Sequence, residues 1–203
     1  VNLIIGKEHI LHDISVSFEK GKIHGLVGRN GSGKTMLMKC ICGFVRYTDG
    51  EIRVDGLRIG KDIDFPKNIG IIIETPGFIP YYSGYKNLKL LAGLKNNIGR
   101  KEIEETIELV GLDPKLKKSV RKYSLGMRQR LGMAQAIMEN PEILVLDEPM
   151  NGLDKQGVND MRELLMKLKE QGKTIILASH STEDIEILCD TVHEMDKGVI
   201  SEM

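Results

Sequence analysis

The segment Gly28–Thr35, with the sequence GRNGSGKT, fits the pattern G-x-x-x-x-G-K-[ST] that cradles phosphate groups. An apolar stretch typical of a strand precedes it and a helical pattern follows it, which is the context that this motif requires. Successive backbone N–H groups and a helix N-terminus then form a nest for an anion, and glycines let the backbone come close to it. We expect Lys34 to reach the terminal phosphates of a nucleotide and the Thr35 hydroxyl to bind Mg²⁺. The residues expected to bind the nucleotide are Gly28, Asn30, Gly31, Ser32, Gly33, Lys34 and Thr35.

Two carboxylates and a histidine follow two later apolar segments. The segment ILVLDEP ends a predicted strand with Asp147 and Glu148, and ASH ends the next strand with His180. Ligands of parallel sheets bind at the carboxyl ends of the strands. We therefore expect Asp147 to hold Mg²⁺ through water and Glu148 to act as general base on a water that attacks the γ-phosphate. A lone histidine is usually a core or surface residue, but at this place His180 is expected to bond the γ-phosphate and to orient Glu148 and the water.

A second phosphate-binding device stands about ninety residues after the first. The segment YSLGMRQR predicts a helix with Ser124 as N-cap and Gly126 close behind, and helix N-termini attract anions. This segment belongs to a helical region away from the first loop, so the two devices are not expected to close on one nucleotide within one molecule. The simplest resolution is a head-to-tail pair, in which the serine of each molecule caps the nucleotide held by the other.

Hydrophobic periodicity indicates the elements that must hold these residues. Short strands are predicted in 2–5, 10–18, 22–28, 51–56 and 68–73, and a helix is predicted from Gly33 to about Cys42 with Gly43 as its C-cap. Residues 76–140 have helical patterns only and form a predicted helical lobe. Strands at 143–147, 174–179 and 191–196 then alternate with helices near 155–171 and 182–189, which predicts a parallel sheet with crossover helices.

Composition limits the class of protein. The 203 residues include 29 basic and 29 acidic side chains, so the net charge is zero, and we expect no nucleic-acid partner. Three cysteines without metal-ligand spacing are expected to be reduced thiols. The longest apolar runs are too short to cross a bilayer.

Together the motifs GRNGSGKT, YSLGMRQR, ILVLDEP, NGLD and ASH, in this order, resemble an ATP-binding-cassette ATPase over essentially the whole chain. The resemblance implies an α/β P-loop NTPase fold with a mainly parallel core sheet, an N-terminal antiparallel β subdomain and an inserted helical subdomain. It implies one domain over 1–203, with 1–75 and 141–203 as the nucleotide-binding core and 76–140 as the lobe that carries the signature. It also implies ATP and Mg²⁺ as ligands, and a dimer, of identical or related subunits, with nucleotides at the seam.

The resemblance assigns roles to further residues. Ser124, Gly126 and Gln129 are expected to contact the nucleotide of the partner molecule, and Asp154 of NGLD is expected to lie at the dimer seam and couple the two sites. The family usually has glutamine after the strand at 68–73, but this chain has Glu74, which is expected to bind Mg²⁺ and to alter coupling to a membrane partner. Tyr123, Leu125 and Met127 replace three usual signature residues, and no aromatic residue stands near Ile4 or Ile5 to stack on adenine.

The segment IIIETPGFIPYYSGYKNL, with its glutamate, is similar to the ATPase subunits of bacitracin and lantibiotic exporters. This likeness implies an ATPase that powers export through a separate membrane permease, at the cytoplasmic face of the membrane. The alternative is a soluble or regulatory cassette ATPase that acts in resistance or sensing without driving transport. The aromatic residues of Phe78–Tyr85 either pack the base of the helical lobe or form a groove for a short helix of the permease.

Overall fold

The computed structural model describes residues 1–95 and 97–202; Asn96, within the predicted helical lobe, and Met203, at the end of the predicted domain, lie outside this part. The strands are β1 Leu3–Ile5, β2 Glu8–Leu11, β3 Ile23–Val27, β4 Arg53–Val54, β5 Leu57–Arg58, β6 Ile69–Ile72, β7 Ile143–Asp147, β8 Thr174–Ala178, β9 Thr191–Asp196 and β10 Val199–Glu202. The helices are α1 Lys34–Ile41, α2 Gly84–Lys95, α3 Arg100–Leu109, α4 Leu125–Ile137, α5 Lys155–Glu170 and α6 Thr182–Leu188, with a 3₁₀ turn, η1, at Val120–Lys122.

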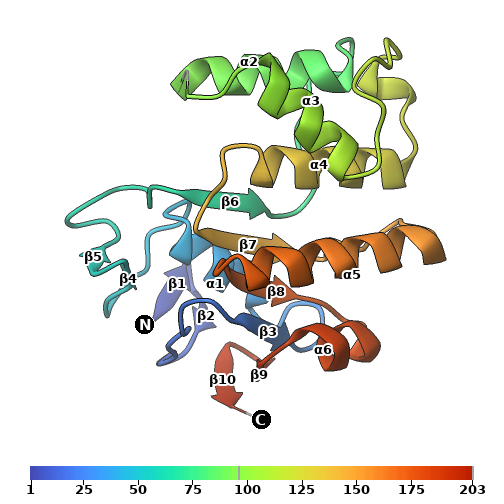
Figure 1. Ribbon diagram of the computed structural model, residues 1–203. Coiled ribbons are helices and arrows are strands. Elements are labelled where there is room, and N and C mark those ends of the chain that lie inside the picture. Colours follow the sequence, from blue (N-terminus) through green and yellow to red (C-terminus); the bar gives the residue numbers. More distant parts are fainter. Residues whose placement is uncertain (96, 203) are drawn as a thin grey trace.

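A six-stranded sheet in the order β10-β9-β3-β8-β7-β6 forms the centre of the molecule (Figure 1). Five of its strands are parallel, and β10 joins β9 in antiparallel fashion. Two small antiparallel pairs, β1-β2 and β4-β5, lie outside this sheet. The predicted α/β class with a mainly parallel core sheet is therefore confirmed.

Alternate residues of the central strands belong to two separate hydrophobic cores. In β7, Leu144 and Leu146 pack in one core, and Val145 between them packs in the other. Successive side chains of a strand point to opposite faces of a sheet, so a strand covered on both faces is apolar throughout. Residues of α4 and α5 complete the first core, and Leu37 and Met38 of α1 belong to the second.

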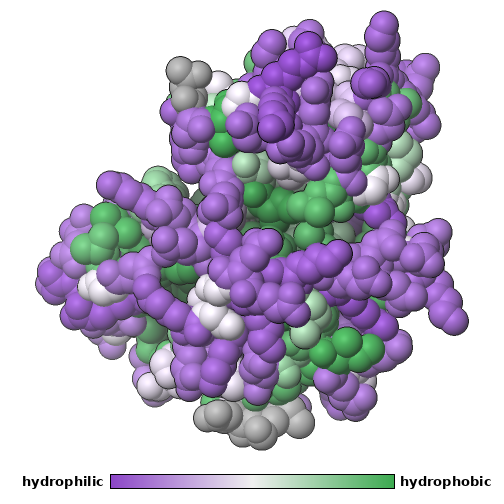
Figure 2. Space-filling model, in the orientation of Figure 1, coloured by the Kyte–Doolittle hydropathy of each residue, from purple (hydrophilic) through white to green (hydrophobic). Residues whose placement is uncertain are grey.

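Helices α2, α3 and α4 lie together beside the sheet edge formed by β6, as Figure 1 shows. The N-cap of α4 is Ser124, as expected, and its Oγ accepts a hydrogen bond from the N–H of Met127 at 3.1 Å. Figure 2 shows that hydrophilic residues cover most of the face in view, while hydrophobic residues gather between α4 and α5. This apolar seam joins the helices of the 76–140 region to the sheet layer.

The predicted strand at 10–18 is wrong over most of its length. Strand β2 ends at Leu11, and Asp13 has a φ of 47°, which turns the chain out of the sheet. Beyond it the burial still alternates, with Ile14 buried and Ser15 and Ser17 exposed, but no strand within 1–95 and 97–202 pairs with this segment. The predicted strand at 51–56 contains only the two-residue β4, which forms a hairpin with β5 just after it, and β10 was not identified from the sequence.

Candidate functional site

Three neighbouring strand ends bring the predicted residues to one edge of the sheet. Strand β8 pairs with β3 on one side and with β7 on the other, all in parallel. The loop that starts at Gly28 follows β3, His180 follows β8, and Glu148 follows β7. Strand β3 also pairs with the much later β9. After β3 the chain crosses to β6 on one side of it, whereas after β8 it crosses to β9 on the other side. Open α/β sheets bind ligands outside the carboxyl ends of their strands at such a switch point.

The loop Gly28–Thr35 is held by close backbone packing and by hydrogen bonds to its own carbonyl groups. Gly28 has a φ of 146°, and a Cβ there would overlap the carbonyl oxygen of Met195 at the end of β9. Nζ of Lys34 donates hydrogen bonds to the carbonyl oxygens of Gly28 at 2.6 Å and Arg29 at 3.1 Å, so the lysine lies inside the loop. The buried Ser32 hydroxyl has no hydrogen-bond partner among the described residues. A buried polar group normally has a partner, so this orphan group fits a loop that binds a polar ligand.

Thr35, at the start of α1, is joined to the end of β7. Its Oγ1 donates a hydrogen bond to Oδ2 of Asp147 at 2.7 Å. The two groups were predicted separately, 112 residues apart in the sequence. A hydroxyl and a carboxylate are hard oxygen ligands of the kind that Mg²⁺ prefers, so the donor set fits this ion.

Glu148 and His180 face each other. Nδ1 of His180 lies 2.8 Å from Oε2 of Glu148. The His180 side chain is 75% exposed and that of Glu148 is 29% exposed, so both reach the surface at this edge. The N–H of Glu148 bonds to the carbonyl oxygen of Ala178 on β8, which fixes the distance between the two strand ends.

Glu74 lies beyond the end of β6, the outermost parallel strand. Its Oε1 accepts a hydrogen bond from Nζ of Lys39 on α1 at 2.5 Å, and its side chain is 64% exposed. The structure thus pairs this predicted Mg²⁺ ligand with a lysine of the helix that also carries Thr35.

Ser124 and Gly126 lie at the exposed start of α4. No hydrogen bond or ion pair connects them with the Gly28–Thr35 loop within 1–95 and 97–202. The start of α4 instead packs against the loop after Glu148. A Cβ at Gly126 would lie 2.9 Å from the carbonyl oxygen of Gly152. Leu125, at the position of a usual signature glycine, covers Gly152 and is 49% exposed.

Gln129 does not lie at the exposed start of α4, where a contact with the nucleotide of a partner would require it. Its side chain is only 7% exposed, and Nε2 donates a hydrogen bond to the backbone carbonyl of Glu148 in the same chain at 3.2 Å. The helical pattern could not distinguish this inward position. Asp154 is exposed as the N-cap of α5, and its Oδ1 accepts a hydrogen bond from the N–H of Gly157 at 2.9 Å.

The aromatic segment Phe78–Tyr85 divides between the two expected roles. Phe78 and Tyr85 pack against the hydrophobic core of the helices, whereas Tyr81 is 73% exposed. Ile4 and Ile5, near which an adenine-stacking aromatic is usual, are about half exposed on β1.

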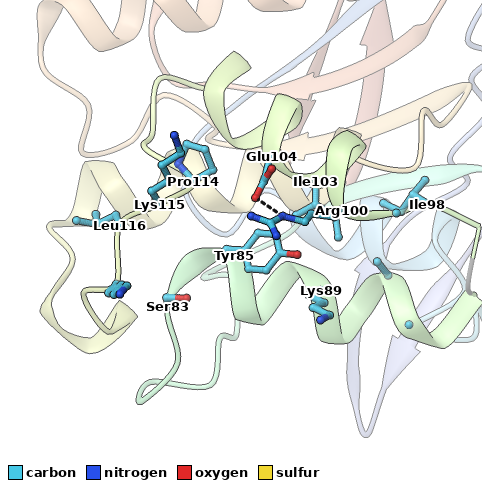
Figure 3. A pocket seen from close by; sticks show the side chains of 14 residues that line it. Ser83, Tyr85, Lys89, Ile98, Arg100, Ile103, Glu104, Pro114, Lys115 and Leu116 are labelled. Atoms are coloured by element: carbon cyan, nitrogen blue, oxygen red, sulfur yellow. Dashed lines mark hydrogen bonds and ion pairs between the residues drawn. The ribbon is translucent and has the colours of Figure 1, made fainter.

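A separate pocket of about 590 Å³ lies between α2, α3 and the residues that follow α3. Figure 3 shows Arg100 beside Tyr85, with its guanidinium bonded to Glu104 at 2.8 Å. None of the residues predicted to bind nucleotide lines this pocket, so it is separate from the candidate site.

The fold and the strand-end cluster define a P-loop nucleotide-binding protein, and the comparisons narrow the class. The family model described as "ABC transporter" matches residues 11–151. The chain belongs to the ABC transporter family and is an ATP-binding cassette ATPase. The structure of MJ0796, described as a dimeric bacterial ABC transporter cassette, superposes with a TM-score of 0.88, with 22% identity over 100% of this chain and 94% of that one. Within the described residues, no helix has the length and apolarity needed to cross a membrane.

Curated relatives include transporter ATP-binding proteins. An uncharacterised ABC transporter ATP-binding protein of Bacillus subtilis, YybJ, is 46% identical over 96% of this chain and 89% of its own length. The bacitracin transport ATP-binding protein BcrA of Enterococcus faecalis is 43% identical over 97% of this chain. The lantibiotic transport ATP-binding protein SrtF of Streptococcus pyogenes is 36% identical over 96% of this chain and 84% of its own length. The chain spans 65% of the length of the Enterococcus protein.

Proposed function

We propose that two ATPase sites form between two cassettes, each with the Gly28–Thr35 loop of one molecule and Ser124 and Gly126 of the other. The observation that carries this proposal is the position of Ser124: it caps an exposed helix and has no bond to the loop of its own chain within the described residues. An exposed helix N-terminus is a ready anion site, and a second molecule can offer it the γ-phosphate.

In each site, Glu148 is proposed to take a proton from a water as the water oxygen bonds to the γ-phosphorus. The bond from that phosphorus to the bridging oxygen breaks, and ADP leaves with the electron pair. His180, 2.8 Å from Glu148, orients the carboxylate and donates a hydrogen bond to the γ-phosphate. When Mg²⁺ accompanies the nucleotide, it would neutralise phosphate charge, and Thr35 and Asp147 would hold it, with Glu74 as a further candidate.

The work of this ATPase is proposed to be export through a separate membrane permease, with the chain bound at the cytoplasmic face of the membrane. A groove of about 790 Å³ supports a docking site between the segment after β6 and the helices. Its lining includes Ile73, Pro76 and Gly77 after β6 and Leu91 and Leu94 of α2. Leu94 is 81% exposed, so apolar surface is open to a partner. The bacitracin and lantibiotic names of the relatives favour peptide antibiotics as cargo.

Complementation tests the composite site. Ser124→Arg leaves the loop intact but blocks the serine, and Lys34→Ala does the reverse. Each variant alone is expected to lack turnover, whereas mixing them restores part of it, because one of the two sites of the mixed dimer has both an intact loop and an intact serine. Mixed samples without activity would contradict the composite site. Co-purification of a permease, with ATPase activity stimulated by bacitracin, would support the proposed cargo class.

A further inference from the structure

The backbone of Glu148 is held in a conformation that ordinary residues seldom adopt. Its φ is 50°, in the left-handed region, which costs a non-glycine residue free energy and persists only where surrounding contacts hold it. The N–H bonds to Ala178 on β8, and the carbonyl oxygen accepts from two donors: Asn151 N–H at 3.1 Å and Gln129 Nε2 at 3.2 Å. The direction of the Glu148 side chain follows from this backbone, so the groups that fix the carbonyl also aim the carboxylate.

Of these donors, only Gln129 comes from outside the sheet and its adjoining loop. It lies on α4, five residues after Ser124, and it is buried. The first turn of the same helix packs on the loop after Glu148, because Gly126 leaves no room for a Cβ against Gly152. The first two turns of α4 therefore contact the segment 148–152 at two points, Gly126 and Gln129.

Arg130, the next residue on α4, bonds two further parts of the chain. Its Nη2 donates to Oδ2 of Asp160 on α5 at 2.8 Å, and its Nη1 donates to the carbonyl oxygen of Val110 at 2.8 Å. The Arg130 guanidinium lowers the pKa of the Asp160 carboxyl, with a hydrogen bond from Gln156 as a lesser cause. Helix α4 is thus bonded to α5 and to the residue that follows α3, as well as to the loop after Glu148.

We propose that Gln129 is a positioning residue for Glu148 of its own chain, and that it couples the two ATPase sites of the dimer. The coupling rests on the composite sites proposed above: Ser124 then contacts the nucleotide of the partner, while Glu148 of the same chain serves the other site. Capture of one nucleotide by Ser124 seats α4, and Gln129 carries that seating to the carbonyl that aims the catalytic carboxylate of the other site.

Gln129→Met tests the link, since methionine retains the length of the side chain and removes the donor. We expect kcat to fall about tenfold, as for loss of one hydrogen bond in the transition state, while KM for ATP stays within twofold because the Gly28–Thr35 loop is untouched. In the nucleotide-free protein, the Asn151 amide, whose N–H shares the Glu148 carbonyl, should exchange hydrogen faster. An unchanged kcat, or a kcat and KM that change together, would overturn the proposal.

Mixed dimers, purified through two different tags, distinguish the bond between Gln129 and Glu148 of one chain from a contact that Gln129 makes with the partner chain. One copy carries Glu148→Gln, which retains the backbone carbonyl, so that only the site with Glu148 of the other copy turns over. Gln129→Met should lower turnover about tenfold when it is on the copy with the intact Glu148, and less than twofold when it is on the Glu148→Gln copy. The opposite pattern would show a trans contact and overturn the proposal.

Ser124→Arg placed on the Glu148→Gln copy is the control for the composite site itself. It should abolish turnover, because that copy supplies the serine to the active site. If it does not, the composite site fails, whereas the hydrogen exchange at Asn151 still decides whether Gln129 holds Glu148.

Discussion

Nδ1 of His180 and Oε2 of Glu148 lie 2.8 Å apart, across the ends of the neighbouring strands β8 and β7. A carboxylate that serves as general base needs a partner that fixes its direction, and a histidine within hydrogen-bond distance supplies one. The His180 side chain is the more exposed of the two, so the pair is open toward the face where a nucleotide and a second molecule would bind.

Glu148→Gln should retain ATP binding and lower turnover by about 10²–10⁴, the usual contribution of a general base. The amide keeps the shape of the side chain but cannot accept the proton. The variant should accumulate as an ATP-bound dimer, which gel filtration with and without ATP would detect. An unchanged monomer peak, or turnover close to that of the unaltered protein, would contradict the role given to Glu148.

The sequence predicted the residues at the strand ends better than the elements between them. Thr35 and Asp147 are 112 residues apart, yet their motifs fixed them to a helix start and a strand end that a parallel sheet must bring together. The segment at 14–18 alternates as a strand does, but alternation reports burial on one side and not the presence of a pairing neighbour. Gln129 shows the same limit. Its motif predicted a helix, but the direction of its side chain, inward to Glu148, depends on how that helix packs.

Glu74→Gln should change the coupling of ATPase activity to the permease more than it changes ATP affinity. Glu74 bonds Lys39 on the surface of α1, and exposed ion pairs contribute about 1 kcal/mol or less, so folding stability should hardly change. Stimulation of ATPase activity by the reconstituted permease, compared with the dissociation constant for ATP, would check this.

Lys39→Met is the matched control for this change, because it removes the same pair and leaves Glu74 charged. If the charge of Glu74 matters for coupling, the two variants should differ. Equal losses of affinity and coupling in Glu74→Gln would contradict the expectation.

The three thiols should be unreactive in the folded protein at pH 8. Burial raises the pKa of Cys40 to about 11 and that of Cys42 to about 12; burial, with nearby Asp190 second, raises that of Cys189 to about 12. Folding favours the neutral form of each thiol. The contribution of these groups to the stability of the folded state is therefore complete below the unfolded pKa of roughly 8.5, and it is lost as the pH rises through the folded values. Labelling with a thiol reagent should be slow in buffer and should reach all three groups in denaturant. Rapid labelling of a native thiol would contradict the raised pKa values.

A buried ion pair joins α5 to α6, the helix that follows His180. Arg162 on α5 donates two hydrogen bonds to Oδ1 of Asp184 on α6, at 2.8 and 2.5 Å, and Asp184 is only 4% exposed. The same α6 turn holds the histidine loop, because Asp184 N–H bonds the Ser181 hydroxyl at 3.3 Å. Asp184→Asn removes the buried partner of Arg162 and leaves it only the exposed Glu183, so it should lower the free energy of unfolding by about 3 kcal/mol.

Glu183→Gln offers the matched control, because Glu183 bonds the same arginine at 3.1 Å but its side chain is 71% exposed. Solvent screens such a pair, so the loss of stability should be much smaller than in Asp184→Asn. Urea titrations of the two variants and the unaltered protein would measure both values. Turnover should fall further in Asp184→Asn than in Glu183→Gln, because the Asp184 carboxylate, unlike that of Glu183, also accepts a hydrogen bond from the Ser179 hydroxyl next to His180, at 3.5 Å. Equal effects of the two changes would mean that the charge on Arg162, and not the buried geometry of Asp184, fixes the loop.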